Sequence, residues 1–392
     1  MAANLLACAS QKSAGEPYRF SGTGIQVYSF EEMLYHCCYK WRQSVDDIFS
    51  EDLADWVQNA LGLSAVAAQM RALAHLDSLV DRLPALLSLT DYIAPKQLDA
   101  LQIELQAWEK RVEWERLKDR ADDLFKHGEA ARAGLLYQQA LMLTTNVTLL
   151  NNLGIALMAQ GQYAQAADCL ARAVALEPEN VMLLLHLTEA YILHGEQAKA
   201  NESLAQAEAL EGAETADIVY FKGEMQFYAV NYARAAAYYE QASAMQYDPQ
   251  YIYRLSDAYV KLRQCDKALD VLQAIRDKDK HFLMAQAEIH AQVNNVPAAA
   301  KCIERALAVN PGGVELWICL ARYHRLNYDL VQAAAAAENA LNLAPENPQA
   351  LLEHARIQKA QGRMRDYQTT MHAVLQGFKA AYRERAGAEV LA

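Results

Sequence analysis

Residues 147–180, VTLLNNLGIALMAQGQYAQAADCLARAVALEPEN, decide the fold. Their apolar residues have the spacing of two short amphipathic helices, with a turn at Gly161 and a stop at Pro178. The same pattern recurs down the chain with a period of about 34 residues. A repeat of this kind cannot bury its apolar face alone, so neighbouring repeats have to stack to make a continuous core.

Three positions at fixed spacing, mostly occupied by small residues, identify each repeat. In the quoted repeat they are Gly154, Ala166 and Ala173, so the second and third follow the first by 12 and 19 residues. The first small position recurs at Ala121, Gly154, Thr188, Gly223, Ser256, Ala287, Ala321 and Ala355. At the second position seven of the eight residues are alanine. Because small side chains let two helices approach closely, the spacing predicts tightly packed helix pairs.

This pattern resembles the tetratricopeptide repeat family over residues 114–381, with repeats starting near 114, 147, 181, 216, 249, 280, 314 and 348. The resemblance implies an all-α fold, a right-handed superhelical solenoid of helix pairs. We expect residues 1–17 to be disordered, residues 18–113 to form a helical N-terminal domain, and residues 382–392 to end a capping helix. The resemblance also implies that the first helix of each repeat lines a concave groove.

The N-terminal domain shows no 34-residue pattern and holds most of the tryptophans, four of the five lying in the first 114 residues. Two strand-like runs at 18–28 predict a hairpin. Ser29 and Glu32 have the spacing of a capping box, so a helix should begin there. Long helices are expected at about 64–90 and 95–127, broken near Pro84 and again at Pro95.

Composition narrows the function classes. A net charge of −12 over 392 residues disfavours a nucleic-acid partner, because a binder of that class needs a large basic surface. No apolar run is long enough to span a membrane. The seven cysteines include no C-x-x-C pair, so we expect no metal, no cofactor and a reducing, cytoplasmic setting. The lipobox-like stretch Leu5–Cys8 lacks a preceding cation, and we attribute it to chance.

Sequence motifs for catalysis are absent. The chain contains no glycine-rich phosphate loop, no G-x-S-x-G elbow and no H-E-x-x-H pair. We therefore do not expect an enzyme.

The resemblance places a set of candidate partner-binding residues on the first helices. They are Asn151, Asn152, Tyr220, Phe221, Phe227, Tyr228, Tyr253, Arg322, Arg325, Arg356 and Lys359. The predicted groove thus changes from amide-lined through aromatic to basic, and the basic end favours a partner segment with acidic residues. Packing between repeats is the alternative for the aromatic residues. A solvated face or an internal ladder of salt bridges is the alternative for the cations.

Some members of this family grip the acidic C-terminal tail of heat-shock chaperones with a clamp of lysine, asparagine and arginine. Lys118 and Asn152 match that clamp, whereas Asp122, Met182 and His186 occupy other positions of it. An aspartate there would repel the carboxylate that the clamp should admit, so the resemblance does not extend to this clamp.

The sequence therefore predicts a protein–protein interaction scaffold or adaptor, similar to a co-chaperone, that binds a partner peptide or helix in its groove. A structural subunit of a bacterial secretion, pilus or envelope assembly is the alternative. The oligomeric state and the role of residues 18–113 stay open.

Overall fold

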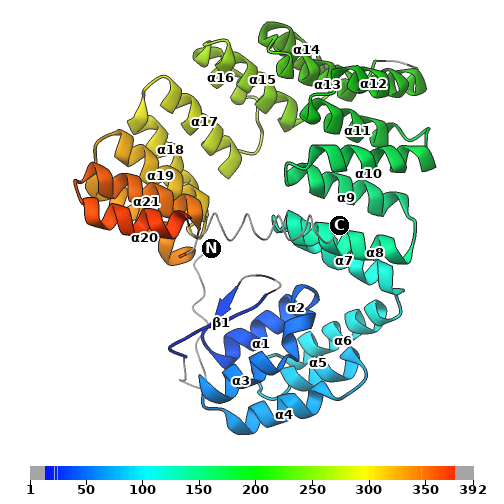
Figure 1. The fold of residues 1–392 in the computed structure, drawn as a ribbon, viewed down its shortest axis with the longest axis vertical. Helices are drawn as coiled ribbons and strands as arrows, with labels where there is room; N and C mark the ends of the chain where they lie inside the picture. Colours follow the sequence, from blue (N-terminus) through cyan, green and yellow to red (C-terminus); the bar gives the residue numbers. More distant parts are fainter. Residues whose placement is uncertain (1–13, 22, 24, 213, 346, 376–392) are drawn as a thin grey trace. The chain divides into compact units, whose positions relative to one another are not determined.

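The computed structural model describes residues 14–375 except 22, 24, 213 and 346 (Figure 1). The stretch Leu5–Cys8 and the expected end of a capping helix at 382–392 lie outside the described residues. The chain divides into two compact units after Gly212. We call them the N-terminal unit and the C-terminal unit, and each is described by itself.

The N-terminal unit begins with a small mixed segment. Strands β1 (Tyr18–Arg19) and β2 (Gln26–Val27) pair antiparallel, as the hairpin prediction required. Six helices follow: α1 (Phe30–Tyr39), α2 (Trp41–Ile48), α3 (Glu51–Asn59), α4 (Ser64–Ala74), α5 (Leu79–Leu87) and α6 (Pro95–Glu109). Ala14, within the stretch expected to be disordered, is buried and donates its backbone N–H to the Tyr28 carbonyl at 2.7 Å.

Side-chain hydrogen bonds mark the starts of α1 and α5. The Ser29 hydroxyl accepts from the Glu32 amide at 3.2 Å, while the Glu32 carboxylate accepts from the Tyr28 amide at 2.7 Å. The expected long helix at 64–90 is instead two helices. At the start of α5, the Glu109 carboxylate of α6 accepts from the Leu79 amide at 2.6 Å. A carboxylate at this place satisfies amides that the helix itself leaves open.

The second expected long helix, over 95–127, is also two helices. It breaks after Glu109, and α7 begins at Glu113. Trp41 likewise begins α2 and does not continue α1. Pro84 lies inside α5 and does not end it.

Three helix pairs complete the N-terminal unit. They are α7 (Glu113–Lys126) with α8 (Ala130–Leu143), α9 (Val147–Ala159) with α10 (Tyr163–Leu176), and α11 (Val181–His194) with α12 (Gln197–Glu211). Each pair is one repeat, and consecutive pairs pack against each other.

The C-terminal unit consists of further pairs. They are α13 (Ala216–Tyr228) with α14 (Tyr232–Met245), α15 (Pro249–Lys261) with α16 (Cys265–Leu272), α17 (Lys280–Gln292) with α18 (Val296–Val309), and α19 (Val314–Leu326) with α20 (Leu330–Leu343). Helix α21 (Pro348–Ala360) follows, and residues 364–375 are helical as well. The predicted all-α fold of consecutive helix pairs is confirmed.

The small residues make the close packing possible. We call the first small position of each repeat its reference position. A Cβ atom added to Gly154 would lie 2.6 Å from Leu170 Cγ, and one added to Gly223 would lie 2.6 Å from Tyr239 Cε1. At these glycines the two helices of a pair are so close that a larger side chain does not fit between them.

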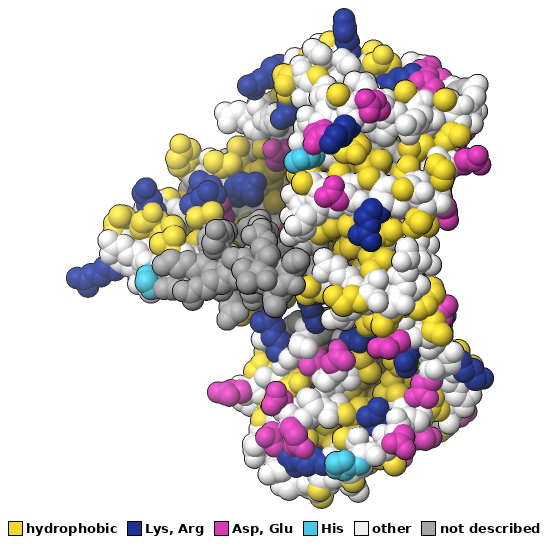
Figure 2. Space-filling view, turned by 45° about the vertical axis from the view of Figure 1, so that its right-hand side comes forward, with side chains coloured by type: hydrophobic (Ala, Val, Ile, Leu, Met, Phe, Trp, Pro, Cys, Tyr) yellow, Lys and Arg dark blue, Asp and Glu magenta, His cyan; other side chains and the backbone are white. Residues whose placement is uncertain are grey.

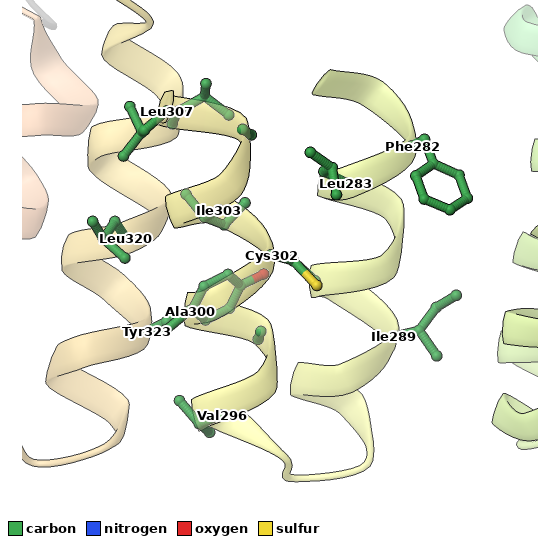
Figure 3. Close-up of a cluster of buried hydrophobic side chains, with 14 of the residues drawn as sticks. Phe282, Leu283, Ile289, Val296, Ala300, Cys302, Ile303, Leu307, Leu320 and Tyr323 are labelled. Atoms are coloured by element: carbon green, nitrogen blue, oxygen red, sulfur yellow. The ribbon is translucent and has the colours of Figure 1, made fainter. Parts of the chain in front are cut away.

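Apolar side chains fill the layers between the helices. In the cluster of Figure 3, Leu283 of α17, Ile303 of α18 and Leu320 of α19 are all buried. This one cluster joins residues from several consecutive repeats, which is how a stacked array forms its core.

The turn within each pair places one residue in the left-handed region, seven residues after the reference position. These residues are Gly128, Gly161, Gly195, Val230, Arg263, Asn294, Tyr328 and Gly362. Four are glycine, which adopts this conformation without strain. The other four are not, and Val230 (φ 65°) is β-branched, so its backbone is strained.

Candidate partner-binding surface

Residues on neighbouring first helices meet in a regular way. At two places the residue one after the reference position of one repeat bonds to the residue two before the reference position of the next. Asp122 bonds to Asn152 in this way, and Glu224 bonds to Arg254. Polar and charged side chains of the first helices are thus tied together from repeat to repeat.

The predicted amide residues form a directional row of hydrogen bonds in the N-terminal unit. Asn151 Nδ2 donates to Asn152 Oδ1 at 3.3 Å, which leaves Asn151 Oδ1 to accept from His186 Nδ1 at 2.7 Å. His186 therefore carries its proton on Nδ1 when neutral. Burial lowers the pKa of His186, so the neutral form is favoured.

Asp122 binds Lys118 and Asn152, the two residues that match the chaperone-tail clamp. Lys118 Nζ lies 2.7 Å from Asp122 Oδ2, and Asn152 Nδ2 donates to Asp122 Oδ1 at 3.1 Å. Tyr137 donates its hydroxyl to the same Oδ1 at 2.6 Å. The donors that would hold an incoming carboxylate in the clamp are already bound to one within the chain.

The predicted aromatic residues divide into two groups. Tyr220 and Phe221 are 5% and 9% exposed, and the Tyr220 ring stacks on Tyr251 with centroids 5.0 Å apart. These two side chains pack between helices, which was the alternative stated for them. Phe227 and Tyr253 are half-buried, and Tyr228 is 44% exposed, so these three reach the surface.

Arg254 organises this aromatic surface. Its Nε donates to Glu224 Oε1 at 2.6 Å, and its Nη2 donates to Oε2 at 2.7 Å. The guanidinium carbon lies 4.3 Å from the ring centroid of Phe227 and 5.8 Å from that of Tyr228. Asp257 Oδ2, 3.5 Å from Nη1, completes the surroundings of the cation. The pair fixes α15 against α13 and presents a cation between two rings.

Two of the four predicted basic residues, Arg325 and Arg356, bind a carboxylate of this chain. Glu353, which is 2% exposed, accepts from Arg325 Nε at 2.6 Å and from Arg356 Nη1 at 3.2 Å. A buried carboxylate needs such partners, because its charge is costly to leave unpaired. Arg322 and Lys359 form no salt bridge within the described part of the chain.

The sequence prediction missed Glu353, the residue that binds two of the cations. Glu353 lies two residues before its reference position, the same place as Asn152 and Arg254. That shared position is the signal that a comparison between the repeats offers.

Exposed apolar residues alone do not mark a binding surface here. They occur at several places on the face shown in Figure 2, and Met142 at 85% and Val309 at 80% exposure lie on second helices. Scattered exposed apolar residues are ordinary on protein surfaces. The candidate surface is therefore described by the polar, charged and aromatic side chains of the first helices.

Among the described residues, no group of three or more His, Cys, Asp or Glu is arranged to hold a metal ion. No helix among them has both the length and the apolar character that a membrane crossing requires.

Comparisons with known proteins agree with the repeat pattern. Two family models described as tetratricopeptide repeat match residues 147–180 and 284–349. Neither is an enzyme family, and tetratricopeptide repeat proteins act as protein-interaction scaffolds. No curated protein matches the chain.

Similar solved structures include yeast Tom70, with 16% identity, 92% of this chain and 89% of that chain covered, and a TM-score of 0.51. A tetratricopeptide repeat protein from Parabacteroides merdae has 16% identity over 62% of this chain and 98% of that chain, with a TM-score of 0.43. One from Thermus thermophilus has 20% identity over 46% and 98%, with a TM-score of 0.40. The likeness to Tom70 shows the fold. The two family matches and the repeated helix pairs support a tetratricopeptide repeat protein.

Proposed function

We propose that this protein is a cytoplasmic adaptor, similar to a co-chaperone, that binds an acidic segment of a protein partner on the first-helix face of α19 and α21. It has no chemistry of its own in this proposal. The family supports the general role, because its members act as scaffolds for other proteins. The partner class rests on the charge of this face.

The observation that carries the proposal is an excess of cations at this face. Arg322 and Arg325 lie on α19, and Arg356 and Lys359 lie on α21. Glu353 accepts bonds from two of them, and Arg356 keeps 52% of its side chain exposed. The chain as a whole has a net charge of −12. An acidic ligand should therefore bind at this local excess of cations rather than at other surfaces of the protein.

The aromatic surface supports the same kind of partner. Phe227, Tyr228 and Tyr253 lie on the first helices α13 and α15, on the same series of helices as the cations. Half-exposed rings can receive apolar residues of a bound segment, and tyrosine also offers a hydroxyl. We therefore expect a segment with both acidic and apolar residues. The role of a structural subunit in a bacterial secretion, pilus or envelope assembly stays an alternative prediction.

The proposal can be tested by selecting peptides from a random display library on the full chain. Selected peptides should be enriched in Asp and Glu. The variant R322E/K359E should lose them, since both substitutions reverse charges that are not used to hold Glu353. Reversal of Arg325 is unsuitable, because it would place a second carboxylate beside the buried Glu353.

The matched control is K301E/R305E, which makes the same change of charge on the second helix α18, where both side chains are exposed. It should keep the selected peptides. If the selected peptides show no acidic enrichment, or if both double variants lose them equally, the proposal is wrong.

A further inference from the structure

A cavity of about 200 Å³ lies among α7, α8 and α9 in the N-terminal unit. Its lining residues are Asp122, Phe125, Lys126, Tyr137, Asn152 and Ile155. A cavity of this size exceeds the ~150 Å³ that takes up one benzene molecule, so it has room for one side chain of a ligand.

The residues of this cavity repeat a constellation found in the C-terminal unit. Asp122 and Glu224 both stand one residue after their reference positions. Each carboxylate accepts a hydrogen bond from the hydroxyl of a tyrosine on the second helix. Tyr137 donates to Asp122 at 2.6 Å, and Tyr239 donates to Glu224 at 2.5 Å. The two tyrosines stand at the same position of their repeats, sixteen residues after the reference position.

The aromatic ring is repeated as well. Phe125 and Phe227 both stand four residues after their reference positions. In the C-terminal unit the guanidinium of Arg254 lies over Phe227 at 4.3 Å and binds Glu224 with two hydrogen bonds. An acid, a tyrosine and a phenylalanine thus form a complete binding site for one guanidinium.

The fourth member differs between the two places. Asn152 occupies the position of Arg254, and it gives Asp122 one hydrogen bond at 3.1 Å. An asparagine side chain is too short to cover Phe125. The cavity is lined by Asp122, Phe125 and Asn152, which stand at the repeat positions of Glu224, Phe227 and Arg254.

We propose that this cavity binds the arginine side chain of a partner segment. The proposal rests on the proposed function in one respect, that the chain binds segments of other proteins. The incoming guanidinium stacks on Phe125 and donates to Asp122, as Arg254 does with Phe227 and Glu224. Arginine suits such a site because its planar cation both stacks on rings and forms directed bonds to carboxylates.

Asp122 has room for the additional donor. A carboxylate offers about four lone-pair positions, and Tyr137, Asn152 and Lys118 occupy three of them. The remaining position is on Oδ2, the atom that Lys118 also holds. Glu115 lies one helical turn before Lys118 and lines a neighbouring cavity with it, so Lys118 has a second acid within reach.

Two lysines face the site and oppose a cation. Lys118 is bound to Asp122, and Lys126 lines the cavity with an exposed side chain. An acidic ligand could use these lysines, but it would then meet the carboxylate of Asp122 inside the cavity. Removal of the lysines should therefore strengthen binding of a cationic ligand and weaken binding of an acidic one.

The test uses the full chain with labelled isoleucine methyl groups, because Ile155 lines the cavity. N-acetyl-arginine methylamide is titrated against N-acetyl-citrulline methylamide, which has nearly the same shape without the charge. The arginine compound should shift the Ile155 methyl signal and bind about tenfold or more tightly than the citrulline compound. Equal binding of the two compounds, or no shift up to the solubility limit of the arginine compound, would overturn the proposal.

Variants separate an arginine site from a general cavity. D122E/N152R recreates the acid and arginine of the C-terminal unit, so it should fill the cavity and abolish the shift. Phe125→Leu keeps an apolar side chain without the ring and should weaken binding several-fold. If D122E/N152R does not fold, Phe125→Leu decides alone, and unchanged binding to it contradicts the proposal.

Removal of the lysines should have the opposite effect on binding of the arginine compound. Lys118→Met and Lys126→Met should each strengthen binding of the arginine compound, and weaker binding would contradict an arginine site. N-acetyl-glutamate methylamide serves as the acidic probe, and a stronger Ile155 shift with it than with arginine also contradicts the proposal. The proposed function is tested at Arg322 and Lys359 of the other unit. A negative result for the arginine site therefore does not decide the test of the proposed function, and the reverse also holds.

Discussion

Arg254 holds Glu224 through two nitrogens of its guanidinium, with Nε 2.6 Å from Oε1 and Nη2 2.7 Å from Oε2. Glu224 is 8% exposed, and Tyr239 donates a third hydrogen bond to it. The pair joins first helices of two consecutive repeats, so it stabilises the packing of one repeat on the next.

The first prediction concerns this pair. Arg254→Met should lower the free energy of unfolding of the C-terminal unit by about 3 kcal/mol, because the Glu224 carboxylate then stays buried without its partner. The double variant E224M/R254M should recover part of that loss, since no charge remains unpaired. Urea titrations of the three variants measure both effects. A loss below about 1 kcal/mol for Arg254→Met would mean that the pair contributes little, as exposed pairs do.

A second prediction uses the strained turn at Val230. Val230→Gly should raise the free energy of unfolding by about 0.5–1 kcal/mol, because glycine adopts a φ of 65° without the steric cost that valine has. Little packing is lost, since Val230 is 66% exposed. Ala229→Gly, at a φ of −77°, is the control and should bring no gain. A stabilised control or a destabilised Val230→Gly in thermal melts would contradict this account of the turn.

A third prediction tests the repeat register at Ala333. Ala333→Leu should destabilise the C-terminal unit by roughly 1–3 kcal/mol, because Ala333 is fully buried in a close helix contact. Ala335→Leu adds the same side chain two residues away on the exposed face of α20 and should have little effect. The difference between the two urea midpoints is the measurement. Equal midpoints would show that Ala333 is not a close packing position.

A fourth prediction concerns pH and His36. Burial lowers the pKa of His36 to about 4, and the ring lies between Phe20, at 4.0 Å between centroids, and the Ser44 hydroxyl at 2.8 Å. Between pH 6.5 and about 4 the unfolded chain binds a proton on this residue that the folded chain does not bind. Stability should therefore fall as the pH falls through this window.

His36→Gln should remove this part of the pH dependence, because glutamine does not titrate. Tryptophan fluorescence is a suitable signal, since Trp41, Trp56 and Trp108 all lie in the N-terminal unit. His186 and His354 also have lowered pKa values, so the comparison is the slope of the variant against that of the natural protein. Identical slopes between pH 6.5 and 5 would contradict the role of His36.

The sequence was sufficient for the fold class and the family, because each depends on small residues at constant spacing. It was insufficient where a contact joins distant positions. No proline or glycine marks the end of α4 after Ala74. The carboxylate that caps the start of α5 comes from Glu109, 30 residues further along the chain. Likewise Arg325 and Glu353 lie 28 residues apart. Their pairing depends on how two first helices align, which the pattern of a single repeat does not contain.

Calorimetric titration of one selected acidic peptide tests whether the charge excess on α19 and α21 binds the partner. The natural protein and K301E/R305E should bind the peptide alike, with affinity that weakens as salt rises. R322E/K359E should bind it about tenfold or more weakly with an unchanged melting curve. Equal affinity of the two double variants, or affinity independent of salt, would contradict an acidic partner at this face.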